Sequence, residues 1–224
     1  MPTRLRHPKA IFLIPVLLVL FAAGIAEGAT SRLYFAGYLG LDTFRSYKFT
    51  ETSVPTTGAI NLRNSPSFGA ALGLHLTDNV RVEAELSYRK PTGSSIGFDS
   101  VGPSSTGLGG NLRTVLMMIN GYYDIPYKIH GVQPFLGAGI GMADVRGHLL
   151  DSSGTVAAQG GTSKGLAWQG GGGLRYTLNS NVSLTGSYRY IGTTDPMIGS
   201  YKFSYHTNEF RMGLEYALPV DWLR

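Results

Sequence analysis

Nine charged side chains recur at alternate positions of otherwise apolar segments in this 224-residue chain. They are Arg81, Glu83, Glu85, Arg89, Arg175, Arg189, Glu209, Arg211 and Glu215. Charges that are removed from water must pair with one another and with hydrogen-bond partners, and this set contains both signs. The pattern therefore predicts a buried ion-pair network, provided that the fold brings the nine side chains together.

His206 and Glu209 are the nearest approach in the sequence to a catalytic base and its partner. A hydrolase of the nucleophilic type needs a nucleophile, a base and a residue that orients the base. No Ser is placed to complete such a set around His206. We interpret His206 as a residue at the rim of the fold and Glu209 as a member of the ion network, and we expect no enzymatic activity.

Signals for a bound cofactor or metal fail on spacing. The glycines of residues 137–141 are one residue short of a dinucleotide fingerprint, and no helix is expected after them. His75, His130 and His148 are scattered over a strand end, a turn and a loop, which does not suit a metal site. The chain has no Cys, and only 15% of its residues are charged. We expect no cofactor, no metal and no nucleic-acid partner.

Residues 165–192 show which elements must position the charged side chains. Apolar and polar residues alternate there on both sides of a short Asn-Ser-Asn turn, with Trp168 and Tyr190 on one face and Arg175 and Arg189 on the other. Period-two alternation predicts a sheet with one apolar and one polar face. Each strand has about ten residues, which is long for a soluble domain and suits a strand that spans a membrane, where roughly 9–11 are needed.

The whole chain reads as eight such strands. They are expected at residues 32–43, 66–76, 80–90, 111–123, 132–144, on each side of the turn within 165–192, and at 205–218. The fourth is the least regular because residues 115–119 are continuously apolar, and we place Asn120 on the inner side. Connections after odd-numbered strands are long and those after even-numbered strands are short. The sequence thus predicts an all-β fold, an eight-stranded antiparallel up-and-down transmembrane β-barrel.

Alternation alone does not distinguish the inside from the outside, and a soluble lipid-binding barrel would place its apolar face inward. An exported chain with aliphatic residues at mid-strand and aromatic residues near the strand ends favours the opposite arrangement. The aromatic residues expected at the two membrane interfaces are Tyr88, Trp168, Tyr176, Tyr190 and Tyr216.

The N-terminus has the layout of a secretory signal peptide over residues 1–28, which leaves 29–224 as the barrel domain. A basic start precedes an apolar run, and small residues follow it, with cleavage expected after Ala26 or Gly28. A retained helical anchor is the alternative, since the run is nearly long enough to cross a bilayer. Removal of this segment would lower the formal net charge from +5 to +3, because it carries three positive residues and one negative residue.

The expected strand pairing puts small residues beside large charged ones. If the second and third strands pair about Asp78, Gly73 lies near Glu83 and Ala71 near Glu85. In the hairpin of residues 165–192, Gln169 would lie near Arg189, Gly171 near Ser187 and Gly173 near Thr185. An eight-stranded barrel has room only for side chains inside it, so the interior is expected to be a polar plug and not an open channel.

Short segments resemble a known group of proteins. They are residues 134–141 with the preceding 122–124, and residues 167–169, 186–190 and 209–216. The chain is similar to small bacterial outer-membrane barrels, which include opacity proteins, Omp25/Omp31-type proteins and Msp4-type surface antigens and are often called porin-like. The resemblance implies a barrel in the outer membrane of a Gram-negative bacterium, with periplasmic termini and four extracellular loops. It departs at the C-terminus, where Leu218 takes the place of the expected aromatic residue and residues 219–224, with Trp222, follow.

The partners that this resemblance implies are outer-membrane lipid, lipopolysaccharide, the barrel-assembly machinery, and a host or environmental ligand at the loops. Basic loop residues can meet lipopolysaccharide phosphates, although solvated loops are the simpler interpretation. These residues are Arg45, Lys48, Arg63, Lys164 and Lys202. The favoured function is a structural and surface-interaction barrel. A small-solute porin, a lipid A-modifying hydrolase and a soluble periplasmic lipid carrier remain alternatives, and no motif identifies the loop ligand.

Overall fold

The computed structural model describes residues 33–44, 47–51, 57–62, 64–90, 92–98, 109–150, 161–194, 197–198, 201–203 and 206–218. The expected signal peptide at 1–28 and the tail at 219–224 lie outside these residues. Within the described part of the chain, no helix is long and apolar enough to cross a membrane. The regular elements described there are all β-strands.

The described residues form thirteen strands. Eight long strands make the barrel wall, and five shorter strands lie within the long connections and form a second group, which we call the outer layer. The barrel strands are β1 (Leu33–Phe44), β4 (Ser65–His75), β5 (Val80–Arg89), β7 (Gly109–Asp124), β8 (Val132–Leu150), β9 (Gly161–Thr177), β10 (Val182–Thr193) and β13 (His206–Ala217). The outer layer contains β2 (Tyr47–Glu51), β3 (Thr57–Leu62), β6 (Thr92–Phe98), β11 (Met197–Ile198) and β12 (Tyr201–Phe203).

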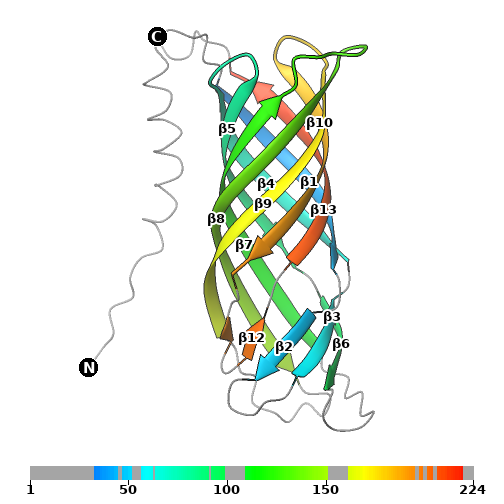
Figure 1. Cartoon of the computed structure of the whole chain (residues 1–224), viewed down its shortest axis with the longest axis vertical. Helices are drawn as coiled ribbons and strands as arrows, with labels where there is room; N and C mark the ends of the chain where they lie inside the picture. Colours follow the sequence, from blue (N-terminus) through cyan, green and yellow to red (C-terminus); the bar gives the residue numbers. More distant parts are fainter. Residues whose placement is uncertain are drawn as a thin grey trace, which may run out of the picture.

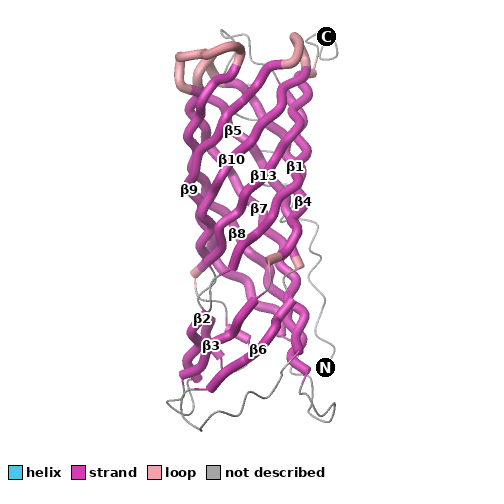
Figure 2. Tube along the Cα trace, turned by 90° about the vertical axis from the view of Figure 1, so that its right-hand side faces the viewer, coloured by secondary structure: helices cyan, strands magenta, loops and turns pink. Residues whose placement is uncertain are grey.

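Eight antiparallel strands close into a barrel in which each strand pairs with its neighbours in the chain (Figure 1). The order around the wall is β1, β4, β5, β7, β8, β9, β10, β13, and the pairing of β13 with β1 joins the first strand to the last. Figure 2 shows the tilted strands running the length of the wall, with short connections at one end and the outer layer at the other. We call these the turn end and the loop end. The predicted eight-stranded up-and-down barrel is confirmed.

The alternation in sequence becomes an alternation between the two faces of the wall. Ile140 and Met212 point outward and are 66% and 74% exposed, whereas Glu83 and Arg89 point inward and are fully buried. Asn120 is also buried on the inner side, as expected. An apolar exterior around a polar interior is the reverse of a soluble barrel that holds a greasy ligand, so that alternative is not favoured.

Tight turns close the turn end with the residues expected there. The hydroxyl of Thr77 accepts a hydrogen bond from the backbone N–H of Val80 at 3.0 Å, and the side-chain oxygen of Asn179 accepts one from Val182 at 2.9 Å. In the third short connection Gly131 has φ of 82°, a conformation that costs glycine little.

The long connections hold more strand than the composition indicated. Residues 44–65, 91–110 and 193–203 were expected to be loops, yet β2, β3, β6, β11 and β12 lie within them. These strands pair with one another as β11-β12-β2-β3-β6, and β6 joins β7. Strands β7, β8 and β9 also extend past their expected loop-side ends. Backbone pairing between different loops supplies hydrogen-bond partners that no local pattern reveals.

The expected register of the β9–β10 hairpin is wrong by two residues. Arg189 pairs with Gly171 and not with Gln169, and Ser187 pairs with Gly173. Leu178 donates its backbone N–H to Val182 and closes the hairpin symmetrically about Ser180. A shift of two keeps every side chain on its predicted face, since strands repeat every two residues. The β4–β5 register is as predicted, with Gly73 opposite Glu83 and Ala71 opposite Glu85.

Candidate functional site

The inner face of the turn end is organised around one buried arginine. Arg81 Nη1 lies 3.1 Å from a Glu83 oxygen and 3.0 Å from a Glu215 oxygen. Its Nε lies 3.2 Å from Asp124. A single guanidinium thus joins carboxylates from β5, β7 and β13, because its fork offers five donors in a fixed plane.

A second arginine completes this turn-end cluster. Arg175 Nε lies 2.9 Å from the other oxygen of Glu215. Two aromatic rings that meet edge to face flank Arg81: its guanidinium carbon lies 4.3 Å from the centre of the Tyr122 ring and 4.8 Å from that of Phe135. The rings fill the space beside the cations and attract them through their negative faces.

Two tyrosines from β1 cap Glu83. The Tyr34 hydroxyl donates to Oε1 at 2.7 Å, and the Tyr38 hydroxyl lies 2.9 Å from both carboxylate oxygens. Tyr34 and Tyr38 are themselves buried. Hydrogen bonds to a carboxylate are among the stronger ones, so these donors compensate the loss of water around Glu83.

In the middle of the barrel Glu85 receives two arginines. Arg189 Nη1 and Nη2 each lie 2.9 Å from one of its carboxylate oxygens, and Arg211 Nη1 lies 2.9 Å from Oε2. Arg211 also donates to the Tyr122 hydroxyl at 2.9 Å, and its guanidinium carbon is 3.9 Å from the centre of the Tyr38 ring. This arrangement ties β5 to β10 and β13.

Two amide side chains extend the central cluster sideways. Asn120 donates to Glu85 at 2.9 Å, and Gln169 donates to the side-chain oxygen of Asn120 at 2.5 Å. Arg189 Nη1 in turn donates to Gln169 at 2.5 Å. The chain of hydrogen bonds returns to its starting residue, so each of these buried polar groups is satisfied.

Glu209 begins a third cluster, nearer the loop end, which we call the loop-end cluster. It pairs with Arg189 and accepts a 2.5 Å hydrogen bond from Ser67. Arg89 Nη2 lies 3.7 Å from Glu209, and Arg89 Nη1 lies 3.1 Å from Asp42. Arg189 therefore links the central and loop-end clusters.

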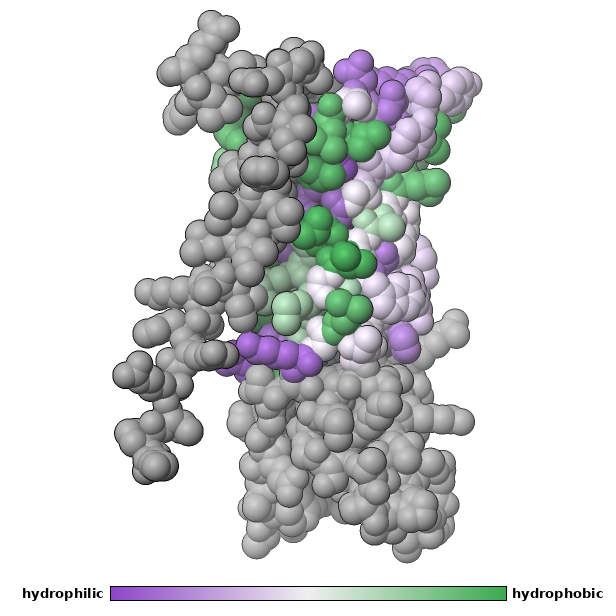
Figure 3. All heavy atoms as spheres, turned by 60° about the vertical axis from the view of Figure 1, so that its left-hand side comes forward, coloured by the Kyte–Doolittle hydropathy of each residue, from purple (hydrophilic) through white to green (hydrophobic). Residues whose placement is uncertain are grey.

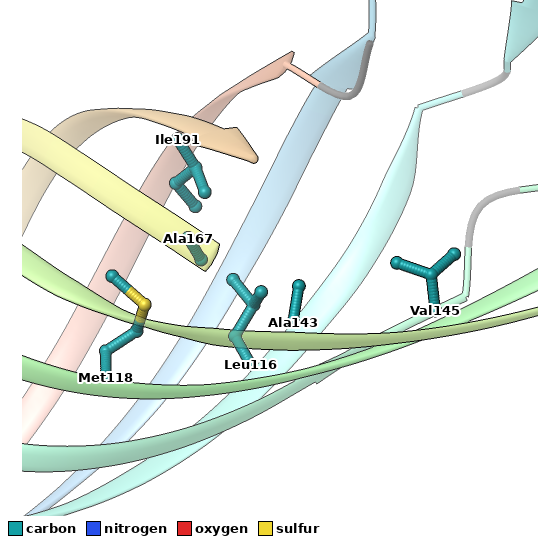
Figure 4. Close-up of a cluster of buried hydrophobic side chains, with 6 residues drawn as sticks. All are labelled: Leu116, Met118, Ala143, Val145, Ala167 and Ile191. Atoms are coloured by element: carbon teal, nitrogen blue, oxygen red, sulfur yellow. The ribbon is translucent and has the colours of Figure 1, made fainter. Parts of the chain in front are cut away.

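An apolar layer sits beside the polar network on the β7–β10 side of the interior (Figure 4). Its members are all at most 4% exposed: Leu116, Met118, Ala143, Val145, Ala167 and Ile191. This layer explains the continuous apolar run at residues 115–119. The outward members of that run continue the apolar exterior, and the inward members fill the bore.

Side chains of the ion network fill the described interior around Tyr122, Gln169 and Arg211. A pocket beside Tyr122, Gln169 and Arg211 has a volume of only about 10 Å³, the scale of a single water molecule. The arrangement is suited to joining the walls of the barrel, and it leaves little space for a solute.

Inward-facing glycines leave room for the large side chains of the interior. Some of the side chains that use this room are aromatic rings and not the charged groups that were expected. A Cβ added to Gly73 would overlap the ring of Tyr34, which lies opposite it on β1, although Glu83 is its partner on β5. A Cβ on Gly137 would likewise overlap the ring of Tyr122. The glycines thus admit aromatic rings as well as charged groups.

All nine charged residues singled out in the sequence lie on the inner face, and each takes part in an ion pair. Further residues of the network were not singled out: Tyr34, Tyr38, Asp42, Ser67, Tyr122 and Asp124. Tyr34, Tyr38 and Asp42 share one parity within the first expected strand, which was the available signal. Asp124 was assigned to a connection because β7 was expected to end at residue 123.

The predicted interface aromatics lie on the outer face in two groups. Trp168 and Tyr190 lie toward the loop end with ring centres 5.5 Å apart, while Tyr176 and Tyr216 lie toward the turn end. Tyr88 is also on the loop side, and Arg113 packs 5.9 Å from its ring centre. Placement of these rings at membrane interfaces stays a prediction.

The one candidate acid–base pair is separated by the wall itself. Glu209 points inward into the ion network, and the ring of His206 stacks on Tyr190 of the outward-facing group, 5.7 Å between centres. The ring centre of His75 lies 5.0 Å from that of Tyr34. Among the described residues, no three His, Asp or Glu side chains are grouped as a metal site would need.

Comparison with known proteins agrees with this architecture. The family model described as "Outer membrane protein beta-barrel domain" matches residues 12–217. Outer membrane protein PagN of Salmonella typhimurium is 25% identical over 242 residues, which cover 93% of this chain and 99% of PagN.

Solved structures that share the fold include OprG and NspA. OprG from Pseudomonas aeruginosa has a TM-score of 0.56 at 15% identity, covering 85% of this chain and 96% of its own. The neisserial surface protein NspA has a TM-score of 0.51 at 16% identity, covering 83% and 97%.

Proposed function

This chain belongs to the outer-membrane β-barrel family, and we propose that it is a non-enzymatic scaffold that closes its own bore and presents its four long connections outside the cell. An outer-membrane barrel contacts lipid with its apolar exterior. The role we assign to this one is mechanical and recognitive: the wall adds to the outer membrane, and the loop end meets other molecules.

The bidentate pair of Arg189 with Glu85 is the observation that carries this proposal. Their strands, β10 and β5, are separated by three other strands in either direction around the wall. The pair therefore crosses the bore, and Arg211 and Gln169 reinforce it. A wide channel would require a ring of side chains that leave the axis open, as in larger barrels.

The orientation follows from the two ends of the barrel. Leu218 donates its backbone N–H to Leu33 at 2.8 Å, so the chain enters and leaves the wall at the turn end. Bacterial outer-membrane barrels carry short turns on the periplasmic side and long loops outside. We therefore assign the turn end and both termini to the periplasm, where the C-terminal strand would be available to the barrel-assembly machinery.

The outer layer is the surface that we assign to recognition. Strands β12 and β2 pair across two different connections, and β3 and β6 join the second of these to a third. Loops that are tied together by backbone hydrogen bonds form a more constant surface than independent loops, which lowers the ordering cost of binding a host or environmental ligand.

Single-cysteine labelling tests the orientation cleanly because the chain has no native Cys. A large membrane-impermeant maleimide should label Asn64→Cys in intact cells and Lys128→Cys only after the outer membrane is permeabilised. Asn64 is exposed and directly precedes β4 at the loop end, and Lys128 lies in a short connection. The opposite labelling pattern would refute the assignment.

Three measurements test the rest of the proposal. The purified barrel should shift on electrophoresis when heated and should show no conductance at the level of large porins in planar bilayers. Overexpression should leave the mass spectrum of lipopolysaccharide unchanged, because His206 and Glu209 lie on opposite faces. Conductance at porin level would favour the pore alternative, and a change in lipid A mass would favour the hydrolase.

A further inference from the structure

Four basic side chains lie at the loop end of four adjacent strands, all on the outer face. Lys90 directly follows β5, Arg113 is on β7, Arg146 on β8 and Lys164 on β9, and all four are exposed. We call them the cationic row. Figure 3 shows this side of the molecule, where hydrophilic residues border the hydrophobic wall at its loop-side edge.

The strand register makes these residues neighbours. Arg113 is directly opposite Arg146 in the β7–β8 pairing. Arg89 is opposite Thr114, which brings Lys90, the next residue, beside Arg113. Outward neighbours on adjacent strands are about 5 Å apart at Cβ, so two arginines that face each other without a ligand repel.

The row extends to the next strand through an acidic residue. Lys164 is opposite Asp144. Asp144 pairs with Arg146 on its own strand, with 3.1 Å between Nε and Oδ1. Four positive charges and one negative charge leave the outer face here with a net charge of +3.

On β7, β8 and β9 the outward-facing side chains change from basic to apolar close to the row. Toward the turn end, the next outward-facing residue after Arg113 is Val115, and the next after Lys164 is Leu166. On β8, Arg146 is followed on the outer face by Asp144 and then by Met142. Met142 and Leu166 are exposed. The row therefore marks the loop-side edge of the lipid-facing wall, the level at which lipid head groups lie.

One member of the cationic row, Arg113, packs against an aromatic ring. Arg113 lies over the ring of Tyr88, with 5.9 Å from its guanidinium carbon to the ring centre. This contact leaves the guanidinium edge available, and guanidinium groups bind phosphate oxygens through paired hydrogen bonds.

We propose that Lys90, Arg113, Arg146 and Lys164 bind the phosphate groups of a lipid A-type glycolipid in the outer leaflet, while the acyl chains lie against the apolar wall on the turn-end side of the row. The proposal rests on the orientation assigned above, because only an outward-facing loop end reaches that leaflet. The phosphates neutralise the facing arginines, and the position at the edge of the wall selects a membrane lipid over a soluble anion.

The test uses the full barrel in nanodiscs and measures binding of bisphosphorylated lipid A, dephosphorylated lipid A and inorganic phosphate. The wild-type protein should bind the bisphosphorylated form at least about tenfold more tightly than the dephosphorylated form. Combined Arg113→Gln, Arg146→Gln and Lys164→Gln substitutions should remove most of that preference. Lys128→Gln, a matched exposed cation at the turn end, should keep it.

Retention of the preference by the triple variant would overturn the site, as would equal binding of the two forms of lipid A. Binding of inorganic phosphate as tight as that of lipid A would overturn the choice of a lipid. The heat-dependent electrophoretic shift shows whether the triple variant is folded. Cysteine labelling reports orientation separately, so an inverted barrel is distinguishable from a correctly oriented barrel that lacks the site.

Discussion

Arg189 reaches across the barrel to Glu85, with both guanidinium Nη atoms 2.9 Å from carboxylate oxygens on the opposite wall. The two residues are 104 positions apart in the chain. The pair depends on closure of the barrel, because no short connection brings β5 and β10 together. It connects the central carboxylate to Glu209 through the same arginine.

Replacement of Glu85 by Ala should destabilise the barrel strongly. Arg189 and Arg211 would keep their buried positive charges without their shared partner, a change that typically costs about 3–5 kcal/mol. Urea unfolding of the refolded barrel in vesicles measures this loss in the free energy of unfolding. Asp144→Ala removes the exposed pair with Arg146 and is the control, with an expected cost of about 0–1 kcal/mol. Equal effects of the two substitutions would contradict a structural role for the network.

Joint replacement of Glu85 and Arg189 by Ala should make the bore more permeable. The double variant removes the bridge together with both of its charges, so water and small ions gain a path beside Gln169. Planar bilayer recordings should show small conductance steps that are absent from the wild-type protein and from Asp144→Ala. A folded double variant that remains as silent as the wild type would show that other side chains close the bore.

Gly73 and Gly37 should respond differently to alanine. A Cβ at Gly73 overlaps the Tyr34 ring, whereas a Cβ at Gly37 meets nothing within 4 Å. Overpacking predicts a loss of about 1–3 kcal/mol for Gly73→Ala. Gly37→Ala should leave stability unchanged or raise it by up to about 1 kcal/mol, because alanine loses less entropy on folding. The free energies of unfolding decide, and a similar cost at both sites would argue against the contact with Tyr34.

Trp168 should report a membrane interface. The chain has two Trp residues, and Trp222→Phe leaves Trp168 as the only indole. Brominated lipids with bromine high on the acyl chain should quench its fluorescence more than lipids brominated near the chain terminus, since aromatic girdles lie at the level of the head groups. Deeper quenching would place the ring in the hydrocarbon core and would shift the assigned boundary.

Strand number, strand parity and the common face of the nine charged residues were predictable from local alternation, whereas assignment of that face to the interior also needed the expected export and the aromatic residues near the strand ends. Alternation is a property of each strand alone, and it does not depend on which strand lies beside it. The two-residue error between Gly171 and Arg189 marks the limit of this approach, because a register shift of two leaves parity unchanged. The strands within the long connections were missed for a related reason: their partners are in other connections.

The sequence by itself determined an eight-stranded barrel with one polar and one apolar face, because period-two patterning and the order of short and long connections leave little freedom in the topology. Only the tertiary structure decided which charges meet. Pairing of Arg189 with Glu85, capping of Glu83 by Tyr34 and the facing arginines Arg113 and Arg146 depend on closure and register. Those two properties join residues that are distant in the chain, and the residue types within one local segment do not specify which distant segment it will contact.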